Sequence, residues 1–357
     1  MKILPISLVF LVAVSASFAS PQAEVGPPQS DTAGQMTLRV TVDSRSGTPV
    51  EGLTAADFKL LDNKKQQPIV SVREVKNQPT RVVVVIDAVN LPFTEVSFAR
   101  QQLSQFFAVN EGKLGQPMTL AILQDSGLQI EPVFTTDGNV LRAALDRSAI
   151  GLREMPNSAG IYGAQERMQT SVTSMESLIT ELPKDGQKRI VWVSAGWPLL
   201  SGPQVHLSAA GEDALFGNVV ALITELHKLH ITIDNVNPLG AAQNVASTDY
   251  YEAFLHAPKQ ARAAELGDLG LQVLATDSGG VVLNGSNDIG ALLQRSIAQS
   301  EDCYEVTFVP SPGEHDNEYH ELQLKMDRSG LTAHTTAGYY ARPIYSPLPN
   351  SGPSRTF

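Results

Sequence analysis

Two side chains of this sequence could act as nucleophiles, Ser194 and Cys303. A serine nucleophile needs a positioned base and an oxyanion hole, and the segment 193–196 (VSAG) lacks the Gly-x-Ser-x-Gly turn on which many such serines sit. Cys303 is the only cysteine, so no disulfide can form within the chain, and the strand-like segment after it indicates a small buried residue. The sequence therefore predicts no enzyme, with a hydrolase as a weaker alternative.

Metal chemistry would require clustered histidines or carboxylates. His206, His227 and His230 lie near one another in sequence, and the last two are three residues apart near the end of an expected helix. Histidines at a helix end are ordinarily solvated or interact with the helix dipole, and no third ligand for zinc is evident. No glycine-rich phosphate loop follows a strand. We therefore expect no cofactor.

Length and charge limit the possible functions. A chain of 357 residues suggests about two domains with tails. Apolar residues make up 42% and charged residues 18%, which is typical of a globular protein and not of a disordered one. The net charge of −11, with no dense cluster of Lys and Arg, argues against nucleic acid and anionic lipid as partners because like charges repel.

The first 19 residues have the pattern of a secretory signal peptide. Lys2 supplies a positive start, residues 6–14 are apolar, and Ser17 and Ala19 place small side chains at a cleavage site. The apolar run is shorter than the ~20 residues of a membrane-spanning helix. We predict a signal peptide over 1–19, a flexible linker over 20–35, and a secreted or periplasmic protein with no stable membrane insertion after cleavage.

Residues 79–301 alternate between buried strands and amphipathic helices. Residues 82–86 (VVVVI) form a continuous β-branched run, as expected of a strand buried on both faces. Further strands are expected at 118–123, 129–134, 189–193, 231–236 and 280–283, and helices at 96–107, 140–145, 161–182, 215–229, 261–275 and 289–300. This rhythm predicts a doubly wound, mostly parallel α/β sheet.

Two stretches of alternating apolar and polar residues predict β structure on either side of that domain. The first covers 36–78, with strands near 36–42, 58–61 and 69–72, and the second covers 302–341, with strands near 304–309, 321–326 and 331–335. Each set is too small to bury a core by itself. We therefore expect one discontinuous all-β sandwich made of both, followed by a disordered tail over 342–357.

Several segments share their order and character with a known family. They are PVEGLTAADF at 49–58 with QPI at 67–69, IDAVN at 86–90, IVWVSAG at 190–196, NVNPLG at 235–240, LATDSGG at 274–280 before Asn287 and Asp288, and GYY at 338–340. In this the chain resembles the VWFA-related domain proteins of the Acidobacterial type. The resemblance implies a von Willebrand A-like, Rossmann-like domain over 79–301.

The resemblance also implies where a metal site would lie. Typical members carry Asp-x-Ser-x-Ser at the end of the first central strand and bind Mg²⁺ with a Thr and an Asp from two further loops, since a hard cation prefers oxygen ligands. Asp87 matches the first position, but Val89 and Leu91 stand at the hydroxyl positions and Ala195 at the second acidic position. This pattern predicts a degenerate site without bound metal.

A strand-end aspartate without metal has another use. We expect Asp87 to cap backbone amides or to bond Asn90. The loops at the strand ends are predicted to form the binding face for a protein partner. The predicted binding residues of this face are Asp87, Asn90, Asp125, Trp197 and Asn237.

Trp197 is the most informative residue of this face, because an aromatic anchor can carry much of the energy of an interface. Val89 and Leu91 would add apolar surface beside it; alternatively they turn inward and Trp197 only covers the end of the sheet. The predicted function is a protein-binding or adhesion-like module without metal. The alternatives are a metal-dependent domain, with Thr170 or Thr173 as the middle ligand, and a hydrolase.

Overall fold

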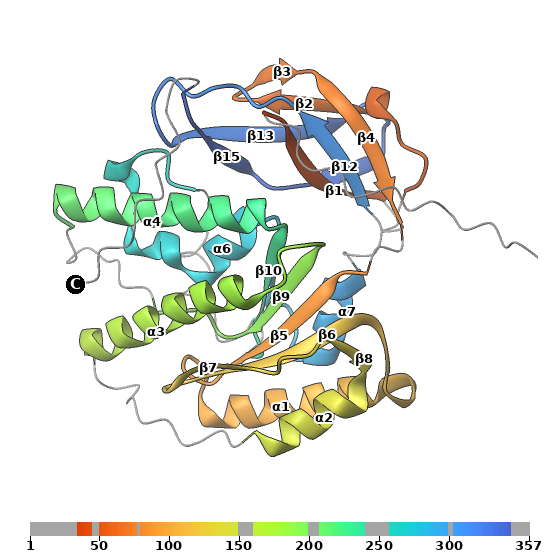
Figure 1. The fold of residues 1–357 in the computed structure, drawn as a ribbon, viewed down its shortest axis with the longest axis vertical. Coiled ribbons are helices and arrows are strands. Elements are labelled where there is room, and N and C mark those ends of the chain that lie inside the picture. Colours follow the sequence, from red (N-terminus) through yellow and green to blue (C-terminus); the bar gives the residue numbers. More distant parts are fainter. Residues whose placement is uncertain are drawn as a thin grey trace, which may run out of the picture.

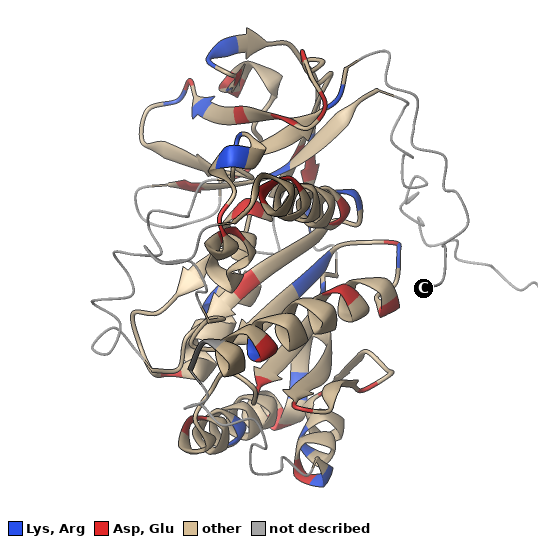
Figure 2. Cartoon of the chain, turned by 90° about the vertical axis from the view of Figure 1, so that its left-hand side faces the viewer, with Lys and Arg blue, Asp and Glu red and all other residues tan. Residues whose placement is uncertain are grey.

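The computed structural model describes residues 34–44, 50–76, 79–148, 160–198, 207–239, 257–298 and 303–343. These residues form two units, a β unit that lies against helix α4 and an α/β unit below it (Figure 1). The predicted signal peptide, nearly all of the linker and nearly all of the tail lie outside the described residues, so these assignments stay predictions. Lys and Arg are interspersed with Asp and Glu over both units (Figure 2).

The α/β unit is built on a seven-stranded sheet with the order β11-β10-β9-β5-β6-β7, and β8 also pairs with β6. The five parallel strands are β5 (Arg81–Asp87), β6 (Lys113–Gln124), β9 (Lys188–Val193), β10 (Ile231–Val236) and β11 (Val282–Leu283). The two antiparallel strands are β7 (Gly127–Ile130) and β8 (Thr135–Asp137). Strand β5, with its continuous β-branched run at 82–86, lies in the interior of the sheet between β9 and β6.

Helices cover both faces of this sheet. One face carries α1 (Phe93–Ala108), α2 (Gly138–Arg147) and α7 (Ile289–Ala298), and the other carries α3 (Gly160–Glu181), α4 (Ala209–Lys228) and α6 (Leu271–Asp277). Successive side chains of β5 alternate between the two cores, Val83 packing toward α3 and Val84 toward α1. The predicted doubly wound, mostly parallel α/β class is confirmed.

One predicted helix of the α/β unit is wrong. Residues 261–275 are not one helix but two 3₁₀ turns, Ala261–Ala263 and Leu266–Leu269, followed by α6. Gly267 and Gly270 interrupt the apolar pattern, and glycine is the weakest helix former after proline. Helix α6 begins directly after Gly270 and runs only to Asp277.

The β unit consists of two four-stranded sheets, ordered β14-β1-β12-β4 and β15-β13-β2-β3. Its strands are β1 (Met36–Ser44), β2 (Phe58–Asp62), β3 (Lys65–Gln67), β4 (Ile69–Val75), β12 (Cys303–Phe308), β13 (Glu318–Met326), β14 (Leu331–His334) and β15 (Gly338–Ala341). A 3₁₀ turn, Ala55–Asp57, precedes β2. Strands from both ends of the chain are neighbours in each sheet, since β1 pairs with β12 and β2 pairs with β13.

The core of the β unit lies between its two sheets. Alternate residues of β1 are buried there, including Leu38 and Val40, against Leu60 of β2 and Val306 and Phe308 of β12. Polar residues between them face outward, which explains the alternation of the sequence. The smaller all-β unit expected beside the α/β domain is therefore present, while its exact domain boundaries stay predictions.

Candidate functional site

The candidate site lies where β5 ends, at the carboxyl edge of the sheet. Strand β5 is flanked by β6 on one side and β9 on the other, and the chain winds outward from β5 in both directions. Side chains and loops that follow the strands converge at such a point, which is why open α/β sheets commonly bind ligands there. Asp87, the last residue of β5, occupies this position.

Asp87 is fully buried and accepts hydrogen bonds from two parts of the chain. Its own turn supplies the backbone N–H of Val89 at 3.1 Å and of Asn90 at 2.9 Å. Strand β9 and the residue after it supply Trp192 Nε1 at 3.0 Å and Ser194 Oγ at 2.9 Å. Burial raises the pKa of Asp87, against these hydrogen bonds, which favour its charged form. The structure thus shows the expected capping of backbone amides.

The side-chain amide of Asn90 completes this arrangement. Its Nδ2 donates to both carboxylate oxygens of Asp87, at 3.1 and 2.9 Å, and to Ser171 Oγ at 2.9 Å. Ser171 comes from α3, is buried, and donates its own hydroxyl proton to the carbonyl of Arg167 at 2.8 Å. The electropositive NH₂ group of Asn90 therefore lies among the oxygens that converge on this point.

Ser171 was missed by the sequence reasoning, which considered Thr170 and Thr173 for the position that faces Asp87. The structure leaves Thr173 exposed and turns Ser171 toward the sheet. A signal was available, because Met168, Ser171 and Met175 share the buried face of α3 at helical spacing.

The oxygens at this point do not fit a divalent cation well. They comprise one carboxylate, two hydroxyls and the amide oxygen of Asn90, whose amide turns Nδ2 toward the other oxygens, and Mg²⁺ needs near-octahedral oxygen coordination. The hydroxyl of Ser194 is turned to donate to Asp87, and Asn90 Nδ2 contacts the remaining oxygens. Among the described residues no group of three or more His, Cys, Asp or Glu side chains could hold a metal ion.

The expectation that Val89 and Leu91 add apolar surface is wrong. Both are fully buried, Val89 in the core beneath α3 and Leu91 in the core beneath α1. The turn after β5 sends these two side chains to opposite faces of the sheet, so each extends an apolar layer. Burial of these side chains is favoured because removing apolar surface from water is favourable.

Trp197 is also buried, with 1% of its surface exposed, so it is not an exposed anchor in this structure. Its ring packs edge-to-face on Trp192 with centroids 5.5 Å apart. Gly196 beside it has φ +108°, and a Cβ there would lie 2.2 Å from the side chain of Gln272. Packing on Trp192 therefore holds the buried Trp197 ring at the end of the sheet, and a role in partner binding stays a prediction.

The other two predicted residues lie at the same edge but do not contact Asp87. Asn237 follows β10, is buried, and uses its Oδ1 to accept the backbone N–H of Leu239 at 3.0 Å. Asp125 is half-buried in the turn between β6 and β7, where Gly127 adopts φ +105°. Of the five predicted residues, the structure joins Asp87 and Asn90 by side-chain hydrogen bonds.

Two aromatic side chains at this edge are exposed instead. Phe93, the first residue of α1, is 53% exposed, and Tyr162, in the first turn of α3, is 81% exposed. Both helices begin at the carboxyl edge of the sheet (Figure 1). The sequence reasoning missed both residues, although Phe93 lies outside the buried stripe of α1 that includes Val96 and Ala99.

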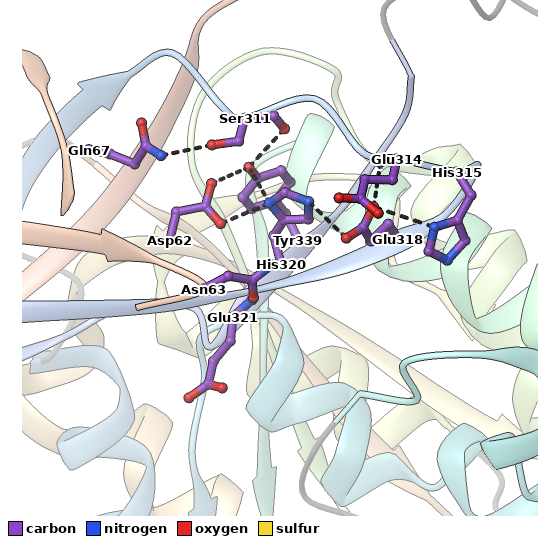
Figure 3. A network of polar contacts seen from close by, with 10 residues as sticks. All are labelled: Asp62, Asn63, Gln67, Ser311, Glu314, His315, Glu318, His320, Glu321 and Tyr339. Atoms are coloured by element: carbon purple, nitrogen blue, oxygen red, sulfur yellow. Dashed lines mark hydrogen bonds and ion pairs between the residues drawn. The ribbon is translucent and has the colours of Figure 1, made fainter. Parts of the chain in front are cut away.

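A second polar cluster lies in the β unit, as Figure 3 shows. Asp62 on β2 contacts His320 Nδ1 at 2.8 Å and accepts the hydroxyl of Tyr339 at 2.8 Å, and all three residues are buried. His320 Nε2 faces Glu318 Oε1 at 3.8 Å, and Glu318 also contacts His315 at 3.4 Å. Burial and the Asp62 carboxylate raise the pKa of Tyr339. Because no hydroxyl or thiol bonds His320 Nε2 in the described part, this cluster ties β2, β13 and β15 together without a nucleophile.

The histidine pair of α4 does not form a metal site either. His227 Nε2 is bonded to the backbone carbonyl of Asp277 at 2.8 Å, and burial lowers the pKa of His227. His230 ends the turn after α4 with φ +52°. His206 lies outside the described residues.

No family model matches the chain, and no curated protein matches it. Solved structures that resemble parts of it include the following three. The SpRpn10 VWA domain is 13% identical, covering 61% of this chain and 95% of its own, with a TM-score of 0.27. The manganese-loaded Plasmodium vivax TRAP protein is 9% identical, covering 74% and 96%, with a TM-score of 0.31. The PilB minor pilin from Streptococcus sanguinis is 11% identical, covering 63% of this chain and 62% of its own, with a TM-score of 0.33. Similarity at this level assigns no function.

Proposed function

We propose that this protein is an adhesion-like, protein-binding module that uses the carboxyl edge of its doubly wound sheet and binds its partner without a metal ion. The observation that carries this proposal is the position of the Asn90 amide, which contacts Asp87 and Ser171 at hydrogen-bond distance. The three side chains form a polar network beneath the loops, where a von Willebrand A-like domain would be expected to hold its cation; within it Asn90 Oδ1 is buried without a hydrogen-bond partner among the described residues.

The electrostatics of Asp87 support independence from metal. A buried carboxylate is costly unless donors or a cation compensate it. Here two backbone N–H groups, an indole, a hydroxyl and an amide all donate to Asp87. A cation between Asp87 and Ser171 would have to displace the NH₂ group of Asn90, so binding it would cost the hydrogen bonds that the amide already makes.

The exposed aromatics support a protein partner. Interfaces are enriched in aromatic side chains at their centres, and these often dominate the binding energy. Phe93 and Tyr162 stand in the first turns of α1 and α3, which cover opposite faces of the sheet. We infer that the partner inserts between these two rings, with the polar groups of the strand-end loops at the rim.

A catalytic role for Ser194 is not supported by its contacts. Its hydroxyl donates to Asp87 and accepts the backbone N–H of Gly196 at 3.1 Å. No imidazole bonds it in the part of the chain that the structure describes. Within the described ranges, Ser194 thus lacks the histidine base that the hydrolase alternative needs.

The proposed location is the periplasm or the outside of the cell, and it rests on the signal pattern of residues 1–19. None of the described helices is long and apolar enough to cross a bilayer.

The binding face is tested with a paired substitution. A tagged chain is used to capture partners from periplasm or culture medium, and the bound protein is identified and its affinity measured. The variant Phe93→Ala with Tyr162→Ala should lose that partner by about tenfold or more, since two aromatic anchors are removed. The matched control, Val70→Ala with Val140→Ala, also removes two exposed apolar side chains, each about half exposed, but from other surfaces, and should retain it.

Metal independence is tested on the same complex. Calorimetric titration with Mg²⁺ or Mn²⁺ should give the same heat for the parent chain and for Asp87→Ala. EDTA should leave capture of the partner unchanged. Capture that is lost in EDTA and restored by Mg²⁺ would favour the metal-dependent alternative. If the variant Phe93→Ala with Tyr162→Ala captures the partner as well as the parent chain does, the binding face lies elsewhere.

A further inference from the structure

We propose a second binding site, for a small amphipathic carboxylate, in a groove of about 570 Å³ between the end of α4 and the β unit. The groove is lined by the last turns of α4, the start of β1, the segment after β12, and β15 together with Arg342, the residue that follows β15 in the sequence. Ligand sites in proteins commonly have volumes of about 300–1,000 Å³ and often lie where two domains meet. This site is independent of the strand-end face proposed above.

Most of the lining is apolar, and part of it is fixed in place. Met36, Ile223, Val309 and Tyr340 are among the side chains that line the groove. Tyr340 packs edge-to-face on Phe216 of α4, and its hydroxyl donates to the carbonyl of Pro258 at 3.2 Å. A wall with a defined position loses little conformational entropy when an apolar ligand binds. The groove thus suits an acyl chain or an aromatic ring.

The charged groups of the lining are of one sign. They are Lys228, on α4, and Arg342, after β15, and no Asp or Glu side chain lines the groove in the described residues. This is unexpected in a chain whose net charge is −11. Two histidines, His227 and His230, also line it, and burial lowers the pKa of His227, which favours its neutral form. Lys228 and Arg342 are the lysine and arginine of the lining.

Both cations are available to a ligand. No ion pair joins Arg342 to another described residue, and its side chain is exposed. Lys228 contacts Glu225 at 3.2 Å, an i,i+3 pair on the helix surface with both side chains substantially exposed. Such exposed pairs contribute little, so a ligand carboxylate can compete for the ammonium group. A ligand with an apolar body and a single negative head group matches both the apolar wall and the two cations of the groove. Inorganic phosphate lacks the apolar body, and an organic cation has the wrong charge.

The experiment uses the full chain and decanoate as the probe, below its micelle concentration. Binding is measured by calorimetry and by NMR. Decyltrimethylammonium has the same apolar body with the opposite charge, and acetate has the head without the body. We expect decanoate to bind at one site and to bind at least about tenfold more tightly than either comparison compound.

Two variants locate the site. Lys228→Gln with Arg342→Gln should weaken decanoate binding by about tenfold, because both cationic partners of the head group are lost. Thr224→Trp, at an exposed position of the lining, should abolish it by filling the groove. The control Lys59→Gln with Arg295→Gln changes the net charge equally at exposed positions outside the groove and should bind normally. Melting temperatures of all three variants should match the parent chain.

Three results would overturn the proposal. Equal binding of decanoate and decyltrimethylammonium would indicate apolar adsorption alone. Unchanged affinity in Thr224→Trp would place the ligand elsewhere. A chain that lacks residues 344–357 is also tested. If decanoate binds to this shortened chain and not to the full chain, the groove belongs to the end of this chain and not to a free ligand.

Discussion

Replacement of Trp197 by alanine separates the two roles considered for this side chain. Its indole is 1% exposed and packs edge-to-face on Trp192, whose Nε1 in turn donates to Asp87. Burial of a Trp side chain removes roughly 200 Å² from water, worth about 5 kcal/mol at about 25 cal/mol per Å². Measured costs of Trp→Ala in cores are about 3–5 kcal/mol. We therefore expect Trp197→Ala to lower the free energy of unfolding by about 4 kcal/mol.

A loss of that size is a large fraction of the roughly 5–15 kcal/mol by which domains are stable. Urea unfolding followed by circular dichroism measures it, and the midpoint should fall while the slope stays the same. Trp197→Phe should lose less, because the aromatic packing on Trp192 is partly kept. Tyr162→Ala, at a position 81% exposed, is the control and should stay within about 0.5 kcal/mol of the parent chain.

Binding to the captured partner is measured on the same variants. Per folded molecule, Trp197→Ala should bind as the parent does, whereas Tyr162→Ala should bind more weakly. An unchanged unfolding midpoint together with weakened capture in Trp197→Ala would refute the reasoning, since it would mean that the indole faces the partner.

Three further predictions concern buried polar groups and the β unit. Asp277 is 3% exposed with neither carboxylate oxygen hydrogen-bonded in the described part, and burial raises its pKa from 3.8 to about 8. The folded chain thus holds this proton more tightly than the unfolded chain, so stability is lost at up to about 1.4 kcal/mol per pH unit as pH rises from about 4 to 8. Asp277→Asn should remove that slope in melts between these pH values while exposed Asp213→Asn keeps it, and an unaltered slope would contradict the assignment. Asn90→Ala removes donors to Asp87 and should cost about 1–3 kcal/mol in urea unfolding; a cost no larger than that of exposed Asn287→Ala would show that the amide is not needed. Deletion of residues 302–357 removes β12 to β15 and leaves β1 without its neighbours, so thermal unfolding should lose its cooperativity and the chain should associate; a monomer of full stability would disprove the shared β unit.

The layered architecture was predictable because it depends on patterns within single segments. The run at residues 82–86 has no polar alternation, and only a strand covered on both faces tolerates that. The bond between Asp87 and Asn90 was predictable for a similar reason, since it spans three residues of one turn. Where the pattern was mixed, as at residues 261–275, the glycines decided against a continuous helix.

The partners of Asp87 from other segments were not predictable in the same way. Ser171 is 81 residues from Asn90, and Trp192 is 105 residues from Asp87. No local pattern relates such positions; only the strand order and the register of β5 on β9 bring them together. The sequence placed Trp197 in the correct loop, but its burial depends on contact with Trp192. The pairing of β9 with β5 turns Trp192 to the face of the sheet on which Trp197 packs.

The turn after β5 is best understood as one unit, not as a metal loop that has lost its ligands one at a time. The family resemblance would place hydroxyls at positions 89 and 91, and the chain carries Val and Leu there. Each of the two closes a different core, one on either side of the sheet. Between them, Asn90 turns its amide toward Asp87 and Ser171. A serine at either apolar position would have to be buried without the partners a cation would bring, at a cost of the kind paid by any unpaired buried hydroxyl. The burial of Val89 and Leu91 and the hydrogen bonds from the Asn90 amide to Asp87 therefore depend on one another. Together they give the strand-end loops a fixed shape without metal.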